Sequence, residues 1–188
     1  GNIGRPMASH LLSAGHRLVV HDARRAAAAD LLAAGAIWAD SPAVLAAQSE
    51  GVATCLPGPV EMESVCLGPG GLLEGLQQGA LYLDHTTNSP LLVRRVQGAL
   101  AAMGVDMLDA PVSGGMEGAR TGDLLVMVGG ERAVFERARP LFDTVARRVL
   151  YAGGIGSGSI AKVMHNCASF TLDLVMAECW TVAVKAGM

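Results

Sequence analysis

Apolar positions recur at helical spacing over the last part of the chain, beyond a glycine-rich turn at 153–158. From about Ser159 to Val184 they return every three or four residues, so one helix of about seven turns is predicted there. Lys162 and Asn166 are four residues apart and share a face of this helix. A lone lysine on an amphipathic helix is usually a solvated surface residue, so spacing alone does not make Lys162 functional.

Before this turn, short apolar runs alternate with helical segments. Buried strands are predicted at 17–22, 37–39, 52–56, 80–84 and 105–108, and helices at 8–14, 23–34, 41–48, 60–66, 71–76 and 89–103. Ser89 followed by Pro90 is typical of a helix start, whereas Gly15 and Gly35 are typical helix stops. This alternation predicts an α/β fold with an open, doubly wound, mostly parallel sheet. Ligands of such sheets bind beyond the carboxyl ends of the strands.

The alternation changes toward the end of the predicted sheet. Strands are expected at 122–130 and 148–152 with a helix at 131–145 between them, so the sheet is predicted to finish with antiparallel or mixed pairing. The glycine-serine turn is the one convincing domain boundary. We therefore predict one sheet domain over 1–154 and a separate helix over 155–188.

The first residues have the spacing of a dinucleotide-binding turn. Gly1 and Gly4 match the last two glycines of a GxGxxG fingerprint, whose first glycine and preceding strand lie outside this sequence. Asp22 follows Gly1 by 21 residues, close to the offset of about 20 at which an acid binds the adenosine ribose. The alternative is an ordinary helix-to-strand connection with an aspartate at the strand end, because Gly-x-x-Gly alone is a weak signal.

Composition narrows the functional classes. Of 188 residues, 51% are hydrophobic and 16% are charged, which is typical of a globular chain with a full core. The net charge is −3 and the basic residues are scattered, so no nucleic-acid-binding surface is expected. The 4 cysteines form no CxxC pair, which indicates neither a disulfide framework nor a metal site and favours a cytoplasmic location. No uninterrupted apolar run reaches the ~20 residues that span a bilayer, so no membrane contact is expected.

Four motifs, in one order, carry a family resemblance. They are Gly1-Asn2-Ile3-Gly4-Arg5-Pro6-Met7-Ala8, Asp84-His85-Thr86-Thr87-Asn88-Ser89-Pro90, Asp109-Ala110-Pro111-Val112-Ser113-Gly114-Gly115, and Gly156-Ser157-Gly158 through Lys162 to Asn166. Over essentially its whole length the chain resembles the β-hydroxyacid dehydrogenases, which include 3-hydroxyisobutyrate dehydrogenase, tartronate semialdehyde reductase and 6-phosphogluconate dehydrogenase. The resemblance implies that 1–154 form a dinucleotide-binding Rossmann domain and that 155–188 form one long interdomain helix, the start of a helical substrate or dimerisation domain. It also implies that the rest of this all-α domain is absent from this sequence. By the same comparison the chain is truncated at both ends.

The resemblance also implies the residues of a site. Lys162 corresponds to the catalytic acid/base, and the residues implied to bind the substrate carboxylate and oxygens are Ser113, Gly114, Gly115, Asn166 and His165. The residues implied to bind the cofactor are Gly1, Asn2, Ile3, Gly4, Asp22, Leu56, Pro57 and Thr87. Asp22 would accept from the ribose hydroxyls and reject a 2′-phosphate, which points to NAD, whereas the nearby Arg24 leaves NADP open.

These roles agree with elementary chemistry. Oxidising a secondary alcohol removes a hydride from carbon and a proton from oxygen, and an amine within hydrogen-bond reach can accept that proton. A lysine desolvated beside a bound nicotinamide would have its pKa lowered toward neutrality. The expected reaction is hydride transfer between NAD(P) and a small β-hydroxy acid, or reduction of the matching semialdehyde.

Two alternatives stay open. The Lys-x-x-His-Asn spacing around His165 resembles 6-phosphogluconate dehydrogenase, but Ser169 stands where the decarboxylating enzyme has a glutamate, which favours oxidation without decarboxylation. The other alternative is a non-catalytic nucleotide-binding module. The full-length parent is expected to be a dimer or tetramer, and whether the given chain is active on its own is left open.

Overall fold

A computed structural model describes all 188 residues and contains a mixed central sheet. Its strands are β3 (Gly51–Thr54), β4 (Leu81–Asp84), β5 (Asp106–Asp109), β6 (Val112–Ser113), β7 (Leu124–Gly129) and β8 (Ala146–Gly153). The order is β3-β4-β5-β7-β6, with β8 also paired to β7. The β3, β4 and β5 strands are parallel, while β7 is antiparallel to β5 and β6 and parallel to β8. The predicted mixed ending of the sheet is therefore confirmed.

The first two strands form a sheet of their own. β1 (Val19–Val20) and β2 (Ile37–Trp38) pair in parallel and share no ladder with β3. The predicted strands thus exist, but β1 is much shorter than the apolar run at 17–22. No strand of the chain lies between β1 and β3, so the two sheets are not joined by backbone hydrogen bonds.

Helices connect the strands and cover both faces of the central sheet. They are α1 (Gly4–Ser13), α2 (Ala29–Ala33), α3 (Pro42–Ala46), α4 (Pro59–Leu67), α5 (Leu72–Gly75), α6 (Pro90–Ala101), α7 (Gly115–Thr121), α8 (Arg132–Val145) and α9 (Ser157–Lys185). The predicted cap of α6 is present, because the Ser89 hydroxyl accepts from Leu91 N at 3.3 Å. Ser41 caps α3 in the same way, accepting from Val44 N at 3.1 Å.

One helix prediction was wrong and one helix was missed. The alanine-rich segment 23–34 is not one helix: a 3-10 turn (Arg25–Ala28) precedes the short α2. Alanine favours a helix, but the backbone at Arg24 is extended (φ −115°, ψ 100°) and its N–H donates to Asp22 Oδ1, so no helix begins before Arg25. The helix α7 was not predicted, because its sequence, rich in glycine and polar residues, lacks an apolar period.

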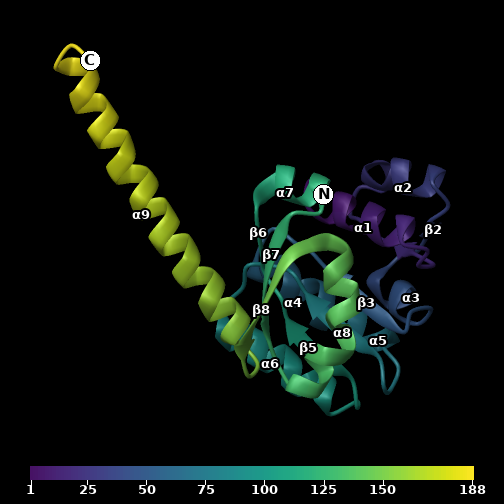
Figure 1. The fold of residues 1–188 in the computed structure, drawn as a ribbon. Coiled ribbons are helices and arrows are strands. Elements are labelled where there is room, and N and C mark those ends of the chain that lie inside the picture. The colour runs from purple at the N-terminus through teal and green to yellow at the C-terminus, as the bar shows by residue number, and fades with distance from the viewer.

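The core consists of two clusters on opposite faces of the sheet. Successive residues of β4 alternate between them: Leu81 and Leu83 pack in one cluster, and Tyr82 packs in the other. The first cluster includes residues of α1 and α8, and the second includes residues of α3, α4, α5 and α6. The chain therefore has the three-layer, doubly wound Rossmann-like α/β fold that its pattern predicts, with helices on both faces (Figure 1).

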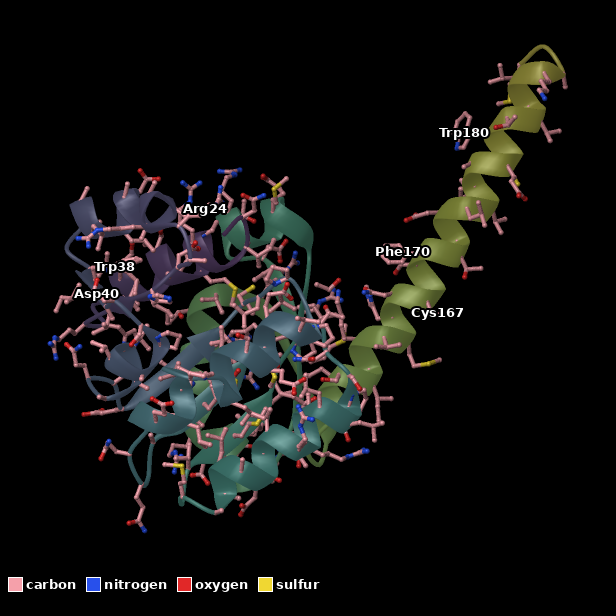
Figure 2. The ribbon with its side chains drawn as sticks, turned by 180° about the vertical axis from the view of Figure 1, so that it is seen from behind. Arg24, Trp38, Asp40, Cys167, Phe170 and Trp180 are labelled. Atoms are coloured by element: carbon pink, nitrogen blue, oxygen red, sulfur yellow. The ribbon has the colours of Figure 1, made fainter.

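The helix α9 leaves this body and extends away from it (Figure 1). Phe170 and Trp180 are 66% and 60% exposed and project from its free part (Figure 2). The helix, Ser157–Lys185, is long and apolar enough to cross a membrane, although polar residues interrupt its apolar sequence. Length and composition alone are weak evidence of a membrane span, because a helix that packs within a protein meets the same criteria.

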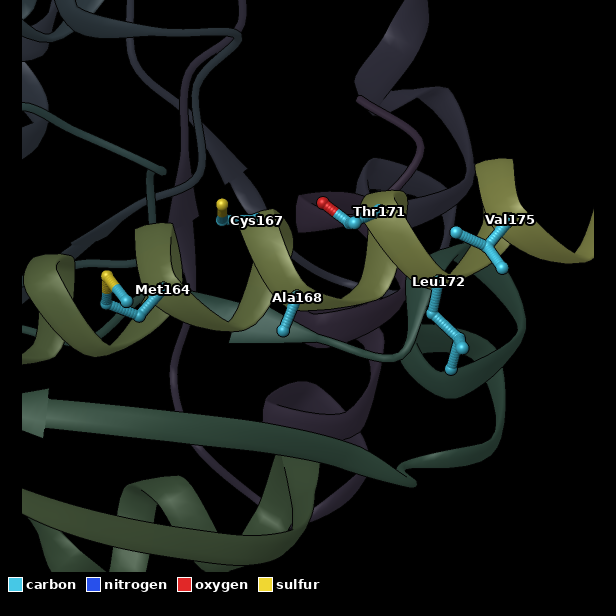
Figure 3. A pocket seen from close by; sticks show the side chains of 6 residues that line it. All are labelled: Met164, Cys167, Ala168, Thr171, Leu172 and Val175. Atoms are coloured by element: carbon cyan, nitrogen blue, oxygen red, sulfur yellow. The ribbon is translucent and has the colours of Figure 1, made fainter.

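One face of α9 carries an exposed, mostly apolar stripe (Figure 3). Its side chains are Met164, Cys167, Ala168, Thr171, Leu172 and Val175. All of them belong to this single helix, so no second wall covers the stripe. Exposed apolar stripes of this kind are typical of surfaces that pack against other protein. The expected dimer or tetramer of the full-length parent stays a prediction.

Candidate functional site

The glycine turn and the strand-end aspartate predicted to hold a dinucleotide lie side by side. Gly1 N is 3.2 Å from Asp22 Oδ2, although 21 positions separate them. Asn2 and Ile3 precede α1 directly, with Ile3 at its N-cap. A Cβ on Gly4 would lie 3.3 Å from Cys55 Cβ, so the turn also approaches the end of β3 closely. The turn thus lies between Asp22 and β3.

The Asp22 carboxylate is half-buried and oriented by backbone. Its Oδ1 accepts from Arg24 N at 2.9 Å. Burial acts to raise the pKa of Asp22, whereas the hydrogen bond from Arg24 N acts to lower it. Arg24, Trp38 and Asp40 lie on the same side of the body, away from α9 (Figure 2). Asp22 is therefore a fixed anion in a surface that also carries arginine.

The strand ends of β3 and β4 continue this surface. Leu56 N donates to Thr86 Oγ1 at 3.1 Å, which joins the Leu56-Pro57 turn to the turn that carries Thr87. Pro57 and Thr87 are both exposed, as a cofactor contact requires. The predicted cofactor residues therefore form one continuous edge at the carboxyl ends of β1, β3 and β4.

The turn after β4 is organised by a fully buried carboxylate. Asp84 accepts from Thr54 Oγ1 at 3.0 Å, from Thr86 N at 3.1 Å and from Asn88 Nδ2 at 2.9 Å. Since a buried charge is costly unless it is hydrogen-bonded, these contacts hold the turn in one conformation.

His85 connects this turn to the next one. The buried imidazole donates from Nδ1 to Ala110 O at 2.7 Å, and it lies edge-on to Phe142 with ring centroids 6.0 Å apart. Burial lowers the pKa of His85, although the Ala110 contact and the charge of Asp84 oppose the shift. His85 is thus held neutral.

This neutral histidine predicts acid sensitivity. The free energy of unfolding should fall as the pH falls below 6.5 toward the lower folded pKa of His85, because the unfolded chain binds the proton more readily in that range. In His85→Asn, which keeps a donor for Ala110 O, the decrease between pH 7.5 and 5.5 should be smaller. Urea denaturation at both pH values measures this. The exposed His16→Gln variant should retain the wild-type decrease, and an unchanged decrease in His85→Asn would contradict the assignment.

The Ser-Gly-Gly turn joins β6 to α7. Ser113 is partly buried and pairs with Leu125 of β7. Gly114 and Gly115 have φ values of 126° and 62°, which L side chains rarely adopt. A Cβ on Gly114 would also lie 3.2 Å from a Leu124 methyl group. Glycine is therefore required for the shape of this turn, and both glycines expose backbone to solvent.

Lys162 is buried, with 8% of its surface exposed, near the start of α9. It forms no ion pair within the chain, and burial lowers its pKa from 10.5. The expectation of a desolvated lysine is met by this position, whereas the chain's other lysine, Lys185, is exposed near the end of the helix. A buried amine without a carboxylate partner is unusual for a purely structural lysine.

Asn166 and His165 follow Lys162 on the partly buried face of α9. His165 Nδ1 is buried and has no hydrogen-bond partner within the chain. No hydrogen bond joins Lys162, His165 or Asn166 to the Ser-Gly-Gly turn. These two parts of the predicted substrate site are therefore connected only through the sheet.

Two buried aspartates were missed as functional residues. Asp84 and Asp109 end the neighbouring strands β4 and β5 and are paired in register. Asp84 orders the turn that carries Thr87, and Asp109 accepts hydrogen bonds from Gly156 N and Ser159 N at the start of α9. Both belong to motifs that carry the family resemblance, but neither was predicted to be a site residue. An aspartate that closes an otherwise apolar strand and precedes a polar turn is the signal that could have identified both.

Comparisons with known proteins agree with this arrangement. The family model described as the NAD binding domain of 6-phosphogluconate dehydrogenase matches residues 1–153. The 3-hydroxyisobutyrate dehydrogenase and the NAD-dependent L-serine dehydrogenase of Pseudomonas aeruginosa are 41% and 39% identical over the whole chain. The solved structure of Mycobacterium tuberculosis 3-hydroxyisobutyrate dehydrogenase with L-serine superposes with a TM-score of 0.91 at 33% identity, covering 100% of this chain.

This chain spans 63% of the length of each of these three proteins. The family match covers the two sheets and their helices, and the similarity to the dehydrogenases continues through α9. The family match and the similarity to the dehydrogenases both confirm the resemblance inferred from the four motifs. The chain belongs to the β-hydroxyacid dehydrogenase family, which includes 6-phosphogluconate dehydrogenase, and the family's NAD-binding domain is the part matched over 1–153.

Proposed function

We propose that the protein transfers a hydride between NAD and a small β-hydroxy acid, or reduces the matching semialdehyde, with Lys162 as the acid/base. The observation that carries this proposal is the burial of Lys162 without an ion-pair partner, on the helix that follows the Rossmann sheet. The named activities of the relatives, on 3-hydroxyisobutyrate and L-serine, support the same substrate class. Both are small carboxylates with a hydroxyl group.

The residues divide the work between binding and proton transfer. Bound NAD would supply the hydride acceptor. The Ser113 hydroxyl and the exposed backbone of Gly114 and Gly115 would hold the substrate carboxylate, since glycine lets an anion approach the N–H groups closely. The neutral Lys162 amine would accept the hydroxyl proton, and its desolvation makes the neutral form available at lower pH than in water. Asn166 and His165 would position the substrate oxygen.

We propose NAD rather than NADP as the preferred cofactor because of Asp22. Its carboxylate is oriented by the hydrogen bond from Arg24 N, so it would accept from the ribose hydroxyls and repel a 2′-phosphate. Arg24 lies beside it and would favour a phosphate once the negative charge is removed.

Asp22→Asn should lower the ratio of NAD to NADP affinity by roughly tenfold or more, because one charge-assisted hydrogen bond is weakened and one repulsion is lost. Fluorescence titration with NADH and NADPH measures both dissociation constants without requiring turnover. Asp30→Asn breaks an exposed pair with Arg5 and serves as the control with an unchanged ratio. An unchanged ratio in Asp22→Asn would exclude Asp22 as the determinant.

The proposed activity is tested by nicotinamide absorbance with a panel of β-hydroxy acids that includes 3-hydroxyisobutyrate, L-serine and 6-phosphogluconate. Turnover of the small hydroxy acids without release of carbon dioxide is expected. Carbon dioxide release from 6-phosphogluconate would instead support the sugar-acid alternative. Cofactor binding without turnover of any panel member would support a nucleotide-binding module.

A further inference from the structure

A buried carboxylate clamps the start of the lysine-bearing helix. Asp109 is fully buried at the end of β5, and its two oxygens have different partners. Oδ1 accepts from Gly156 N at 2.7 Å and Oδ2 accepts from Ser159 N at 2.7 Å. Gly156 is the N-cap of α9, so one side chain satisfies two N–H groups of the first turn across 47 and 50 residues of sequence. The negative charge of Asp109 also lies at the N-terminus of this 29-residue helix, where the helix dipole is positive and favours an anion.

Two glycines lock this clamp against the sheet. A Cβ on Gly158 would lie 2.5 Å from Asp109 O and would also collide with Met127 O. A Cβ on Gly129 would collide with the Asp109 carboxylate and lie 2.7 Å from Gly158 N. The backbones of β5, β7 and α9 thus meet at a distance that no side chain permits, so α9 can take only one position there.

The clamp residue is also part of the strand that leads to the Ser-Gly-Gly turn. Asp109 is four residues before Ser113, and β5 and β6 are both paired to β7. Lys162 is three residues after Ser159, less than one turn from the clamped N–H. Asp109 is therefore linked by short, rigid segments to both the proposed carboxylate-binding turn and the proposed proton acceptor.

We propose that Asp109 is a positioning residue that sets Lys162 relative to the Ser113-Gly114-Gly115 turn. Its two hydrogen bonds hold the first turn of α9 against the sheet. This anchoring keeps Lys162 buried at the position where it would contact a bound hydroxy acid. Asp109 contacts no substrate and transfers no proton. The catalytic part of this inference rests on the proposed function, whereas the anchoring of α9 by Asp109 does not depend on it.

The anchoring is tested by chemical labelling, which requires no activity. Limited acetylation with acetic anhydride, read out by peptide mass spectrometry, compares Lys162 with the exposed Lys185 in the same molecule. Asp109→Asn replaces one carboxylate oxygen by an NH2 group, which cannot accept from the backbone N–H that faces it. The first turn of α9 should then be held less firmly, so the ratio of labelling at Lys162 to labelling at Lys185 should rise by about fivefold or more. Asp106→Asn, on the same strand in an exposed pair with Arg137, is the control with an unchanged ratio. An unchanged ratio in Asp109→Asn would overturn the proposal.

The catalytic part is tested by a double-mutant cycle. Asp109→Asn should lower kcat by roughly tenfold or more, with the NADH dissociation constant within about twofold of wild type. In the Lys162→Ala background the same substitution should change kcat by less than about twofold, because the residue acts through Lys162. Equal losses in both backgrounds would mean a structural role only and would overturn the proposal.

The cycle separates this proposal from the proposed function. If Lys162→Ala alone retains wild-type turnover, the proposed function fails, and the labelling ratio still decides whether Asp109 anchors the lysine. If Asp109→Asn does not fold, Asp109→Ser replaces it in both measurements, because its smaller side chain leaves room and its hydroxyl can accept one of the two N–H groups.

Discussion

In the full-length protein, Lys162→Ala is expected to lower turnover by roughly 10²- to 10⁴-fold, the usual contribution of a general acid or base. The dissociation constant for NADH should stay within about twofold of wild type, since the cofactor edge at β1, β3 and β4 does not include this helix. Steady-state kinetics and NADH fluorescence titration measure the two quantities. Lys185→Ala removes the chain's other lysine and should leave both unchanged. Near-normal turnover in Lys162→Ala would remove the residue from the mechanism.

The pH profile provides a second check of the same role. Burial lowers the pKa of Lys162 from 10.5, so the neutral amine is populated at lower pH than in solvent. Oxidation requires the neutral amine, and its rate should rise with pH through the pKa of Lys162. Reduction requires the ammonium, and its rate should fall over the same interval. Lys162→Arg should rescue neither direction, because arginine keeps its proton.

Gly158→Ala is expected to lower the free energy of unfolding by roughly 3 kcal/mol, because the new methyl group would overlap backbone atoms of Met127 and Asp109 that cannot move aside. Turnover of the folded fraction should also fall, by up to about 10²-fold, if α9 shifts by about 1 Å to relieve the overlap. Urea denaturation and steady-state kinetics measure the two effects.

Gly154→Ala is the matched control for this substitution. It lies in the same turn, its φ is not in the left-handed region, and nothing lies within 4 Å of a Cβ built on it. Its stability and turnover should be close to those of wild type. A stable, active Gly158→Ala variant would mean that the contact between α9 and the sheet is looser than the glycine packing indicates.

Local signals in the sequence were enough to predict the fold class and most elements. Apolar runs and capping residues such as Ser41 and Ser89 depend on neighbours within a few positions, so they can be recognised without tertiary structure. The failures have tertiary causes. The alanine-rich segment has high helix propensity over 23–34, but the hydrogen bond from Arg24 N to Asp22 holds its first residues extended, and only a 3-10 turn and a short helix follow.

The site divides in the same way. The sequence by itself determined the family, the Gly1-to-Asp22 spacing and Lys162 as the candidate acid/base, because motif order and offset are readable along the chain. Only the tertiary structure decided that Lys162 is buried without a partner and that Asp109 holds its helix across 47 and 50 residues. Burial and long-range hydrogen bonds depend on how strands and helices meet in space, and nothing local to Asp109 reveals which N–H groups will reach its carboxylate.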